Sequence, residues 1–152
     1  MPEGYVPGVT KFTNNPDVPG TGAFDAGGDP VVAFSPDGRN AYFVCQAFDF
    51  SSNAIRLLLN RGTVTRTGIT WQTSGLTTVS AWTGNGKTRG GNGQFPDHES
   101  IHVDPVSGRV IHSNTNFAPQ KPIWDSTRGA LVDPAAGDVR QIAAPKPDYE
   151  GE

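Results

Sequence analysis

The chain has 152 residues, and its 12 lysines and arginines against 15 aspartates and glutamates give a formal net charge of −3. This balance, without a basic block, excludes nucleic acid as an expected partner. Glycine (19) and proline (13) are abundant, while three tryptophans and eight phenylalanines indicate an ordered core. The combination favours many short strands joined by long turns.

The single cysteine and the start of the chain restrict the class of protein further. Cys45 has no second cysteine with which to form an intrachain disulfide or a cysteine-based metal site. Its position inside the strand-like residues 42–46 predicts a small buried side chain rather than a reactive thiol. No apolar run reaches membrane-spanning length, and the first residues do not resemble a signal peptide. We therefore expect a cytoplasmic protein or an internal piece of a secreted one.

The first part of the chain predicts a loop followed by a sheet. Residues 1–28 are rich in glycine, proline, asparagine and aspartate, which predicts an irregular entry loop. Residues 36–39 predict a turn, because proline fixes φ and glycine accepts a positive φ. Residues 77–82 are expected to enter the next unit, and the glycine-rich residues 84–93 to form a flexible loop. Strands are predicted over residues 31–35, 40–48, 54–60 and 69–73.

The second part predicts a shorter, less complete sheet. Strands are expected over residues 100–104 and 109–115, with a weaker third strand near Ile123 and Trp124. Beyond Pro134 the sequence is mostly turn-forming, and residues 143–152 predict a linker or a cut end. No segment has a sustained helical period. The expected organisation is therefore an entry loop (1–28), a first unit (29–96), a second, partial unit (97–142) and the linker.

The two units repeat one another in sequence. Asp-Pro-Val-Val-Ala-Phe-Ser-Pro-Asp-Gly-Arg begins at Asp29, and Asp-His-Glu-Ser-Ile-His-Val-Asp-Pro-Val-Ser-Gly-Arg begins at Asp97. The matched positions are Asp29 and Asp97, Pro36 and Pro105, Gly38 and Gly108, and Arg39 and Arg109. A fixed period of strand pairs and turns indicates a stacked β architecture, in which one unit cannot bury its own apolar face.

This layout resembles the blades of sialidase-like β-propellers, also called BNR or Asp-box repeat proteins. In that family each blade carries Ser-x-Asp-x-Gly-x-x-Trp in the hairpin of its third and fourth strands. Here Asn60-Arg61-Gly62 lacks the Ser and Asp, and Ser126-Thr127-Arg128-Gly129 has Arg in the Asp position. The turn Ser35-Pro36-Asp37-Gly38 resembles instead that of TolB-like propeller repeats. Both resemblances imply an all-β fold of about two four-stranded blades of a six-bladed propeller.

Two blades cannot close a ring, and open edges would leave backbone groups unpaired. We therefore expect further propeller blades, supplied in cis or by oligomerisation. The Arg triad of sialidases cannot be placed residue by residue. Arg61, like Arg39, Arg109 and Arg128, occupies a turn-like repeat position where a solvated side chain is expected.

His98-Glu99-Ser100-Ile101-His102 matches the His-Glu-x-x-His pattern of zinc metalloproteases. That chemistry needs a helix, which Pro105 would stop within two turns. In a strand the two histidines would lie about 13 Å apart, too far for one zinc ion. We therefore expect an accidental match, with no metal and no cofactor.

The candidate ligand-binding residues are Asp97, His98, Glu99 and Trp82. In a strand Ile101 and Val103 share a face that should meet the neighbouring blade, which leaves residues 97–99 at the strand entrance. Such a rim surrounds the ligand site in propellers of this kind. Asp29 and Asp97 have an alternative role, since a residue in both units suits capping of the turn before each innermost strand. Trp82 is the most exposed aromatic expected and could stack on a sugar ring.

The resemblance implies a fragment of an exo-glycosidase-related propeller that acts on or binds glycans outside the cytoplasm. An alternative is a non-catalytic binding module, either a two-blade lectin that trimerises or a protein-interaction propeller. Whether the chain is an enzyme, and which residues would be catalytic, stays open at this point.

Overall fold

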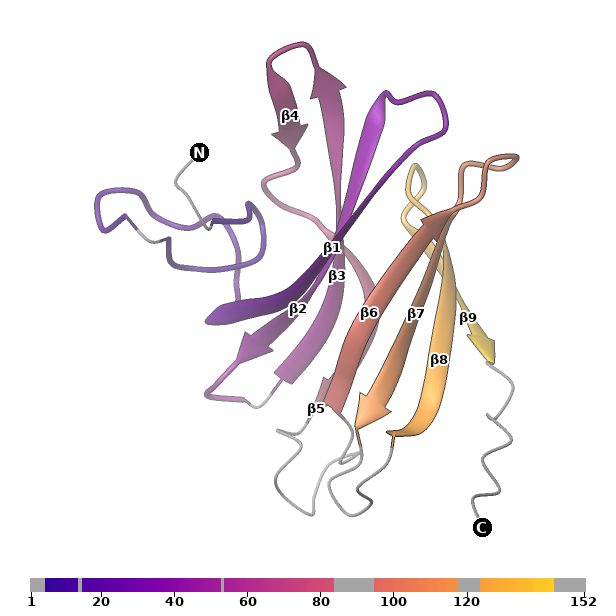
Figure 1. The fold of residues 1–152 in the computed structure, drawn as a ribbon. Coiled ribbons are helices and arrows are strands. Elements are labelled where there is room, and N and C mark those ends of the chain that lie inside the picture. Colours follow the sequence, from indigo (N-terminus) through magenta and orange to yellow (C-terminus); the bar gives the residue numbers. More distant parts are fainter. Residues whose placement is uncertain (1–4, 14, 53, 84–94, 118–123, 144–152) are drawn as a thin grey trace.

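The computed structural model describes residues 5–13, 15–52, 54–83, 95–117 and 124–143, with only the backbone given for 82–83, 95–99, 113–117, 124–129 and 142–143. In this part of the chain the regular elements are nine strands, arranged in two antiparallel sheets (Figure 1). The expected all-β class is confirmed. The two sheets remain open and form no closed ring within the described residues.

The first sheet is four strands wide, with an interrupted fourth strand. It runs in the order β1-β2-β3-β4, and β5 also pairs with β3. Since β4 pairs with one end of β3 and β5 with the other, together they fill the fourth position. The expectation that residues 77–82 enter the next unit was therefore wrong. The strands are β1 (Ala26–Phe34), β2 (Asn40–Asp49), β3 (Ala54–Thr65), β4 (Gly68–Trp71) and β5 (Thr77–Thr83).

The second sheet is a complete four-stranded meander in the order β6-β7-β8-β9. Its last strand contradicts the expectation of mere turns beyond Pro134. The turn at residues 134–137 closes a tight hairpin, where Gly137 takes a φ of 77°. Val139 in β9 pairs with the buried Val132 and packs against the core. Tertiary packing therefore forms a strand in a segment whose turn-forming residues did not predict one. The strands are β6 (Phe95–Val103), β7 (Val110–Phe117), β8 (Trp124–Asp133) and β9 (Asp138–Ala143).

The sequence repeat is also a repeat of register. The β1–β2 pairing shifts between Gly28 and Val31, and the β6–β7 pairing shifts between Asp97 and Ser100. Each shift lies the same number of residues before the following hairpin, where Phe34 pairs with Ala41 and Val103 with Val110. The hairpin glycines, Gly38 and Gly108, both have a φ of 69°. The two sheets are therefore copies of one bulged unit, and the paired residues of their first three strands correspond position by position.

The main core lies between the two sheets. From the first sheet it takes residues of β2, β3 and β5, and from the second residues of β6, β7 and β8. Val103 is buried there and Ile101 packs against it, which confirms that this face of β6 meets the neighbouring sheet. The first strands of the two sheets, β1 and β6, lie side by side (Figure 1). The largest apolar side chains of this core are Tyr42, Ile55, Leu57 and Leu59.

The sheets stack front to back. Tyr42 in β2 faces the second sheet and is 4% exposed, whereas its counterpart Ile111 in β7 faces away from the core and is 39% exposed. Conversely, Phe43 lies outside the main core while its counterpart His112 is buried. Opposite faces of equivalent units are thus in contact, which is the head-to-tail arrangement that can in principle repeat.

The outer face of the first sheet is covered by an N-terminal cap (residues 5–13 and 15–25). Val9, which is 1% exposed, packs with Phe43, Cys45 and Leu58 in a second core cluster. Lys11 of the cap pairs with Asp25, Nζ to Oδ1 at 3.0 Å. The predicted burial of Cys45 is confirmed. The N-terminal cap is mostly irregular, as expected for the entry loop, but residues 26–28 of that predicted loop belong to β1, and the cap covers the sheet.

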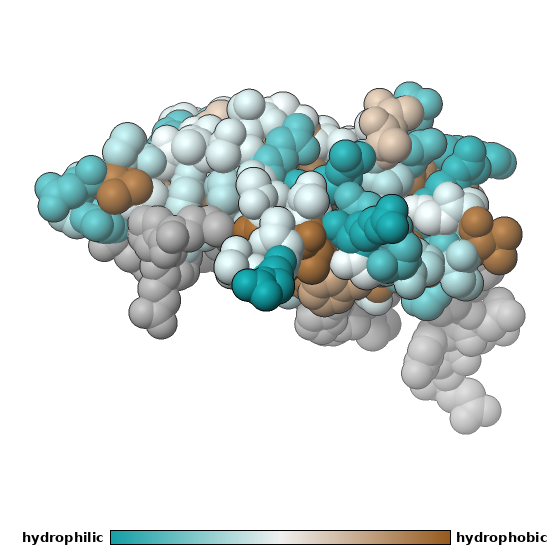
Figure 2. All heavy atoms as spheres, turned by 90° about the horizontal axis from the view of Figure 1, so that it is seen from above, coloured by the Kyte–Doolittle hydropathy of each residue, from teal (hydrophilic) through white to brown (hydrophobic). Residues whose placement is uncertain are grey.

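The outer face of the second sheet has no such cover in the described residues. Ile111 and His102 are exposed there, and Arg140 lies beside Leu131. Seen from above, the molecule is mostly hydrophilic, with separate hydrophobic spots rather than one continuous patch (Figure 2).

Candidate functional site

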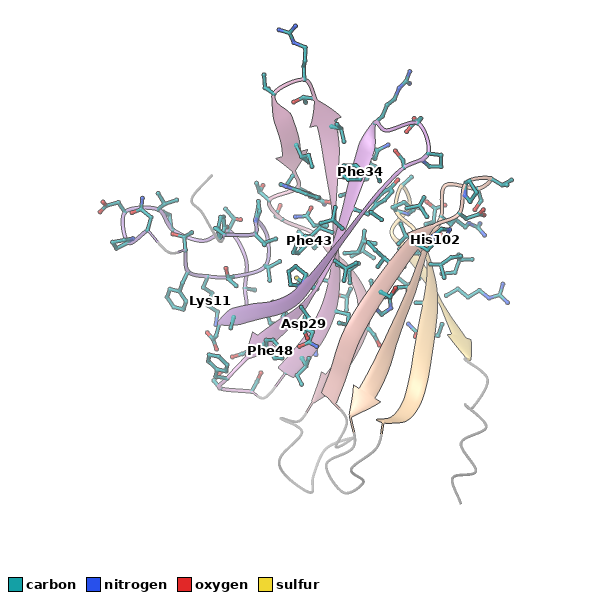
Figure 3. All side chains as sticks on the ribbon, viewed as in Figure 1. Lys11, Asp29, Phe34, Phe43, Phe48 and His102 are labelled. Carbon is teal, nitrogen blue, oxygen red and sulfur yellow. The ribbon has the colours of Figure 1, made fainter. Side chains whose placement is uncertain are left out.

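The bulge of β1, the first strand of the first sheet, places an aspartate in an unusual backbone conformation. Asp29 has a φ of 46°, the one positive φ of a non-glycine residue in the described chain. Asp tolerates the left-handed region better than most residues, at a cost of about 1–3 kcal/mol in conformational strain. Its Oδ2 accepts a hydrogen bond from Nε2 of the buried Gln46 in β2, at 3.1 Å. The carboxylate is thereby held at the surface of the bulge (Figure 3).

The register changes the correspondence between the two units at this point. Two residues fill each bulge, Asp29 and Pro30 in β1 and His98 and Glu99 in β6. The counterpart of Asp29 is therefore His98, not Asp97 as the sequence alignment indicated. The expectation that Asp29 caps a turn before the strand was also wrong, since this residue lies inside β1.

The four predicted ligand-binding residues lie where only the backbone is described. Asp97, His98 and Glu99 belong to β6, and Trp82 belongs to β5. Their side chains lie outside the described residues, so their grouping around a ligand stays a prediction. The backbone places residues 98–99 at the bulge of β6, the strand that neighbours β1.

The segment that matches the zinc-protease pattern is a strand, not a helix. His98 and His102 both belong to β6, and the side chain of His102 is exposed (Figure 3). The helical geometry that would bring both imidazoles to one metal ion is therefore contradicted. Among the described residues, no cluster of three or more His, Cys, Asp or Glu side chains could hold a metal. The described part also holds no helix able to cross a membrane.

A second candidate site lies at the opposite edge of the first sheet, where the fourth strand is interrupted. The last pair of β4 joins Gly62 to Trp71, and the nearest pair of β5 joins Leu59 to Thr77. Between these two pairs β3 advances three residues, whereas the segment that joins β4 to β5 advances six. Three residues of this segment therefore bulge out of the sheet. The second sheet has no such insertion, because β9 is continuous.

This insertion and the β8–β9 turn enclose a pocket of about 490 Å³, here named the edge groove. That volume lies within the range of small-molecule sites. One wall comes from β3, β4 and the insertion, and the other from the turn at residues 134–137. The lining residues are Arg61, Thr63, Thr70, Trp71, Gln72, Gly75, Thr77, Pro134, Ala135, Ala136 and Gly137.

Strand pairing sets the first wall of the edge groove. Thr63 pairs directly with Thr70, so two hydroxyl side chains lie next to each other on the face toward the second sheet. Arg61 lies two residues along the same face, and its carbonyl accepts a hydrogen bond from the Gln72 amide at 3.1 Å. Gln72 Nε2 donates to the Gly75 carbonyl at 3.1 Å, which closes the inserted loop on itself.

Buried contacts support this wall on the face of the sheet that is turned toward the N-terminal cap. A Cβ atom on Gly62 would approach Trp71 Cε3 to 2.7 Å, so glycine leaves room for the indole beside β3. Trp71 meets Phe43 edge to face, with ring centroids 5.9 Å apart. Asn60 Nδ2 donates to the carbonyls of Pro7 and Gln72, both at 2.9 Å. The insertion is thus tied both to the sheet and to the N-terminal cap.

The guanidinium of Arg61 forms no ion pair or side-chain hydrogen bond within the described residues. The nearby Asp133 carboxylate accepts hydrogen bonds from the Ala135 and Ala136 amides, which lower the pKa of Asp133 and fix it as part of the turn. Burial raises the pKa of Tyr42, while the positive charge of Arg61 opposes that rise. The edge groove therefore combines a cation free to bind with hydroxyl and amide groups.

Sequence reasoning missed the edge groove. It assigned Arg61 to a turn, whereas this residue lies inside β3, which extends to Thr65. A usable signal was present, since residues 72–76 break an apolar alternation that resumes at Thr77. The pocket itself depends on the turn at residues 134–137, which is distant in sequence and which no local pattern reveals.

Comparison of the chain with protein-family models, with curated proteins and with solved structures gave no match.

Proposed function

We propose that this chain is a sialidase-like β-propeller module of two blades that binds glycans outside the cytoplasm. The observation that carries the proposal is the front-to-back stacking of two equivalent bulged sheets with their first strands side by side. Radial repetition of such sheets is how propellers are built, with ligands bound where the innermost strands converge. Further blades, in cis or from other copies, would complete the ring.

The ligand site in this proposal is the pair of innermost-strand bulges. Asp29 offers a carboxylate that Gln46 fixes in orientation, and residues 98–99 occupy the corresponding bulge of the neighbouring strand. Carboxylates, imidazoles and amides are the groups that bind sugar hydroxyls through paired hydrogen bonds. Asp97, His98 and Glu99 of the second unit and Trp82 of the first unit remain the proposed ligand-binding residues.

Two versions of the proposal differ in chemistry. In the first, the chain belongs to an exo-glycosidase, and Asp97 or Glu99 serves in acid–base catalysis. In the second, the propeller binds glycans or proteins without turnover, for example as a two-blade lectin that assembles into a six-bladed trimer. The open outer face of the second sheet favours assembly with further blades in either version.

The test combines a glycan array with light scattering after size exclusion, using the full chain. We expect glycan binding that Asp29→Asn weakens about tenfold, because a charge-assisted hydrogen bond is lost, while the exposed Asp17→Asn leaves it unchanged. Turnover of aryl glycosides by the same sample selects the enzyme version, and binding without turnover selects the lectin version. No glycan binding by any assembled species, with the fold intact by circular dichroism, would overturn the proposal.

A further inference from the structure

The edge groove has no role in the fold that the two units share. The counterparts of Arg61 and Thr63 in the second sheet are Leu131 and Asp133. At the first of these positions the repeat therefore accepts an aliphatic side chain, so the architecture does not demand a cation. The three-residue insertion that opens the groove is likewise confined to the first sheet.

The groove is also distinct from the innermost-strand site. It is lined by β3, β4, the insertion and the β8–β9 turn, whereas the bulges belong to β1 and β6. In the first sheet, β3 and β4 are the third and fourth strands from β1. A ligand in the edge groove would therefore contact none of the residues proposed for glycan binding at the bulges.

The chemistry of the lining defines the ligand. Arg61 presents a planar set of donors that suits an oxyanion such as carboxylate or phosphate. The paired hydroxyls of Thr63 and Thr70 donate and accept, which suits ligand hydroxyl groups, and the Gln72 amide is held beside them. With Asp133 engaged by the turn amides, no acidic side chain neutralises Arg61 among the described residues.

From these observations we propose that the edge groove binds a small hydroxylated anion, with its oxyanion on Arg61 and its hydroxyls on Thr63 and Thr70. The pocket volume of about 490 Å³ accommodates a ligand of one or two sugar rings. The oxyanion is a carboxylate or a phosphate, and the two are separated by experiment.

The experiment is a titration of the full ¹⁵N-labelled chain, followed by NMR, with glucuronate, glucose 6-phosphate and glucose as separate probes. We expect shifts at Arg61, Thr63, Thr70 and Gln72 with one or both anions and much weaker binding of glucose. The tighter of the two anions identifies the oxyanion. Glucose binding as tightly as either anion, or anion-induced shifts confined to other parts of the chain, overturns the proposal.

Variants make the test specific. Arg61→Met is expected to weaken anion binding about tenfold or more, the effect of losing a charge-assisted hydrogen bond. Arg140→Met is the matched control, since Arg140 is exposed on the far sheet and does not line the groove. Equal loss in both variants would show only a general charge effect and reject the site.

A second, shape-conserving variant tests the hydroxyls. Thr63→Val with Thr70→Val keeps the β-branched pair and the strand, and is expected to weaken glucuronate several-fold while leaving the binding of acetate unchanged. Unchanged glucuronate binding in this double variant would contradict the assignment of the hydroxyls. Thermal unfolding by circular dichroism confirms that each variant is folded.

Discussion

The two sheets share one register but differ in what covers their outer faces. The first sheet is sealed by the N-terminal cap, with Val9 packed over Phe43 and Leu58. In the second sheet Ile111 occupies the position equivalent to Tyr42, and it is exposed whereas Tyr42 is buried. The same unit therefore adopts the same backbone whether or not its outer face is covered, which means that register and bulge are properties of the unit. The cover decides how many apolar side chains contribute to stability.

The largest expected effect comes from breaking the seal on the first sheet. Val9→Asp places a charge without a partner in a site that is 1% exposed, and we expect a loss of more than about 4 kcal/mol in the free energy of unfolding. Val18→Asp, in an exposed part of the same cap, is expected to change it by less than about 0.5 kcal/mol. Urea denaturation of both variants measures the difference, and similar values would show that the cap is not part of the core.

A matched pair of truncations compares the covered and open faces directly. Tyr42→Ala is expected to cost about 3–5 kcal/mol, as large aromatic truncations in cores do, and its counterpart Ile111→Ala less than about 1 kcal/mol. The same urea experiment measures both. If the cost of Ile111→Ala rises with protein concentration, a second molecule or blade covers this face in solution. Equal costs at low concentration would contradict the front-to-back stacking.

Burial of a histidine where the first sheet has Phe43 makes the second sheet sensitive to pH. His112 is 1% exposed, its Nε2 has no hydrogen-bond partner in the described residues, and burial lowers its pKa to about 4. Between pH 6.5 and 4 the unfolded chain binds a proton that the folded chain does not. The stability that depends on neutral His112 is therefore complete above pH 6.5 and falls as the pH drops toward 4, by up to about 3 kcal/mol.

His112→Phe, which introduces the residue of the first sheet, isolates this contribution. The aspartates with lowered pKa also destabilise the fold when they are protonated, so the wild-type slope alone does not identify His112. Urea denaturation at pH 7, 6, 5 and 4 is expected to give a flatter profile for the variant. An unchanged profile between pH 6.5 and 5 would mean that His112 is protonated in the folded state.

The smallest expected effect on stability concerns one cross-strand pair, which the two sheets form with different residues. The first sheet pairs Gly62 with Trp71, and the second pairs Val132 with Val139 at the same register. Gly62→Ala forces a Cβ to 2.4 Å from Ile69 Cγ2, for which we expect a loss of about 1–3 kcal/mol. The double variant Gly62→Val with Trp71→Val copies the second sheet and is expected to recover part of that loss. If urea denaturation shows that the double variant loses as much stability as its two single substitutions together, the valine pair cannot replace the Gly62–Trp71 pair in the first sheet.

Local sequence patterns predicted the parts of the fold that local chemistry determines. Alternating apolar residues marked most strands, and the hairpin glycines Gly38 and Gly108 take the positive φ that their turns require. The failures arose where distant contacts decide. Strand β9 is formed by packing of Val139, and β5 returns to β3 rather than entering the next sheet.

The candidate sites also differ in whether local sequence or distant contacts determine them. The first strand of each unit was foreseen as the start of a repeat, although the pairing register makes His98, not Asp97, the counterpart of Asp29. The edge groove was not foreseen, because its walls come from a three-residue insertion in one sheet and a turn of the other. Insertion and turn become one site only after both sheets have folded.

The N-terminal cap also gives the molecule an order of assembly. The cap packs on the sheet that follows it directly in the chain, so the cap and the first sheet can form from one contiguous stretch. During synthesis that stretch emerges before β6, and its exposed Tyr42 face then offers a template on which the second sheet can fold. The chain would thus fold vectorially, with the cap and the first sheet formed before the second sheet packs on them.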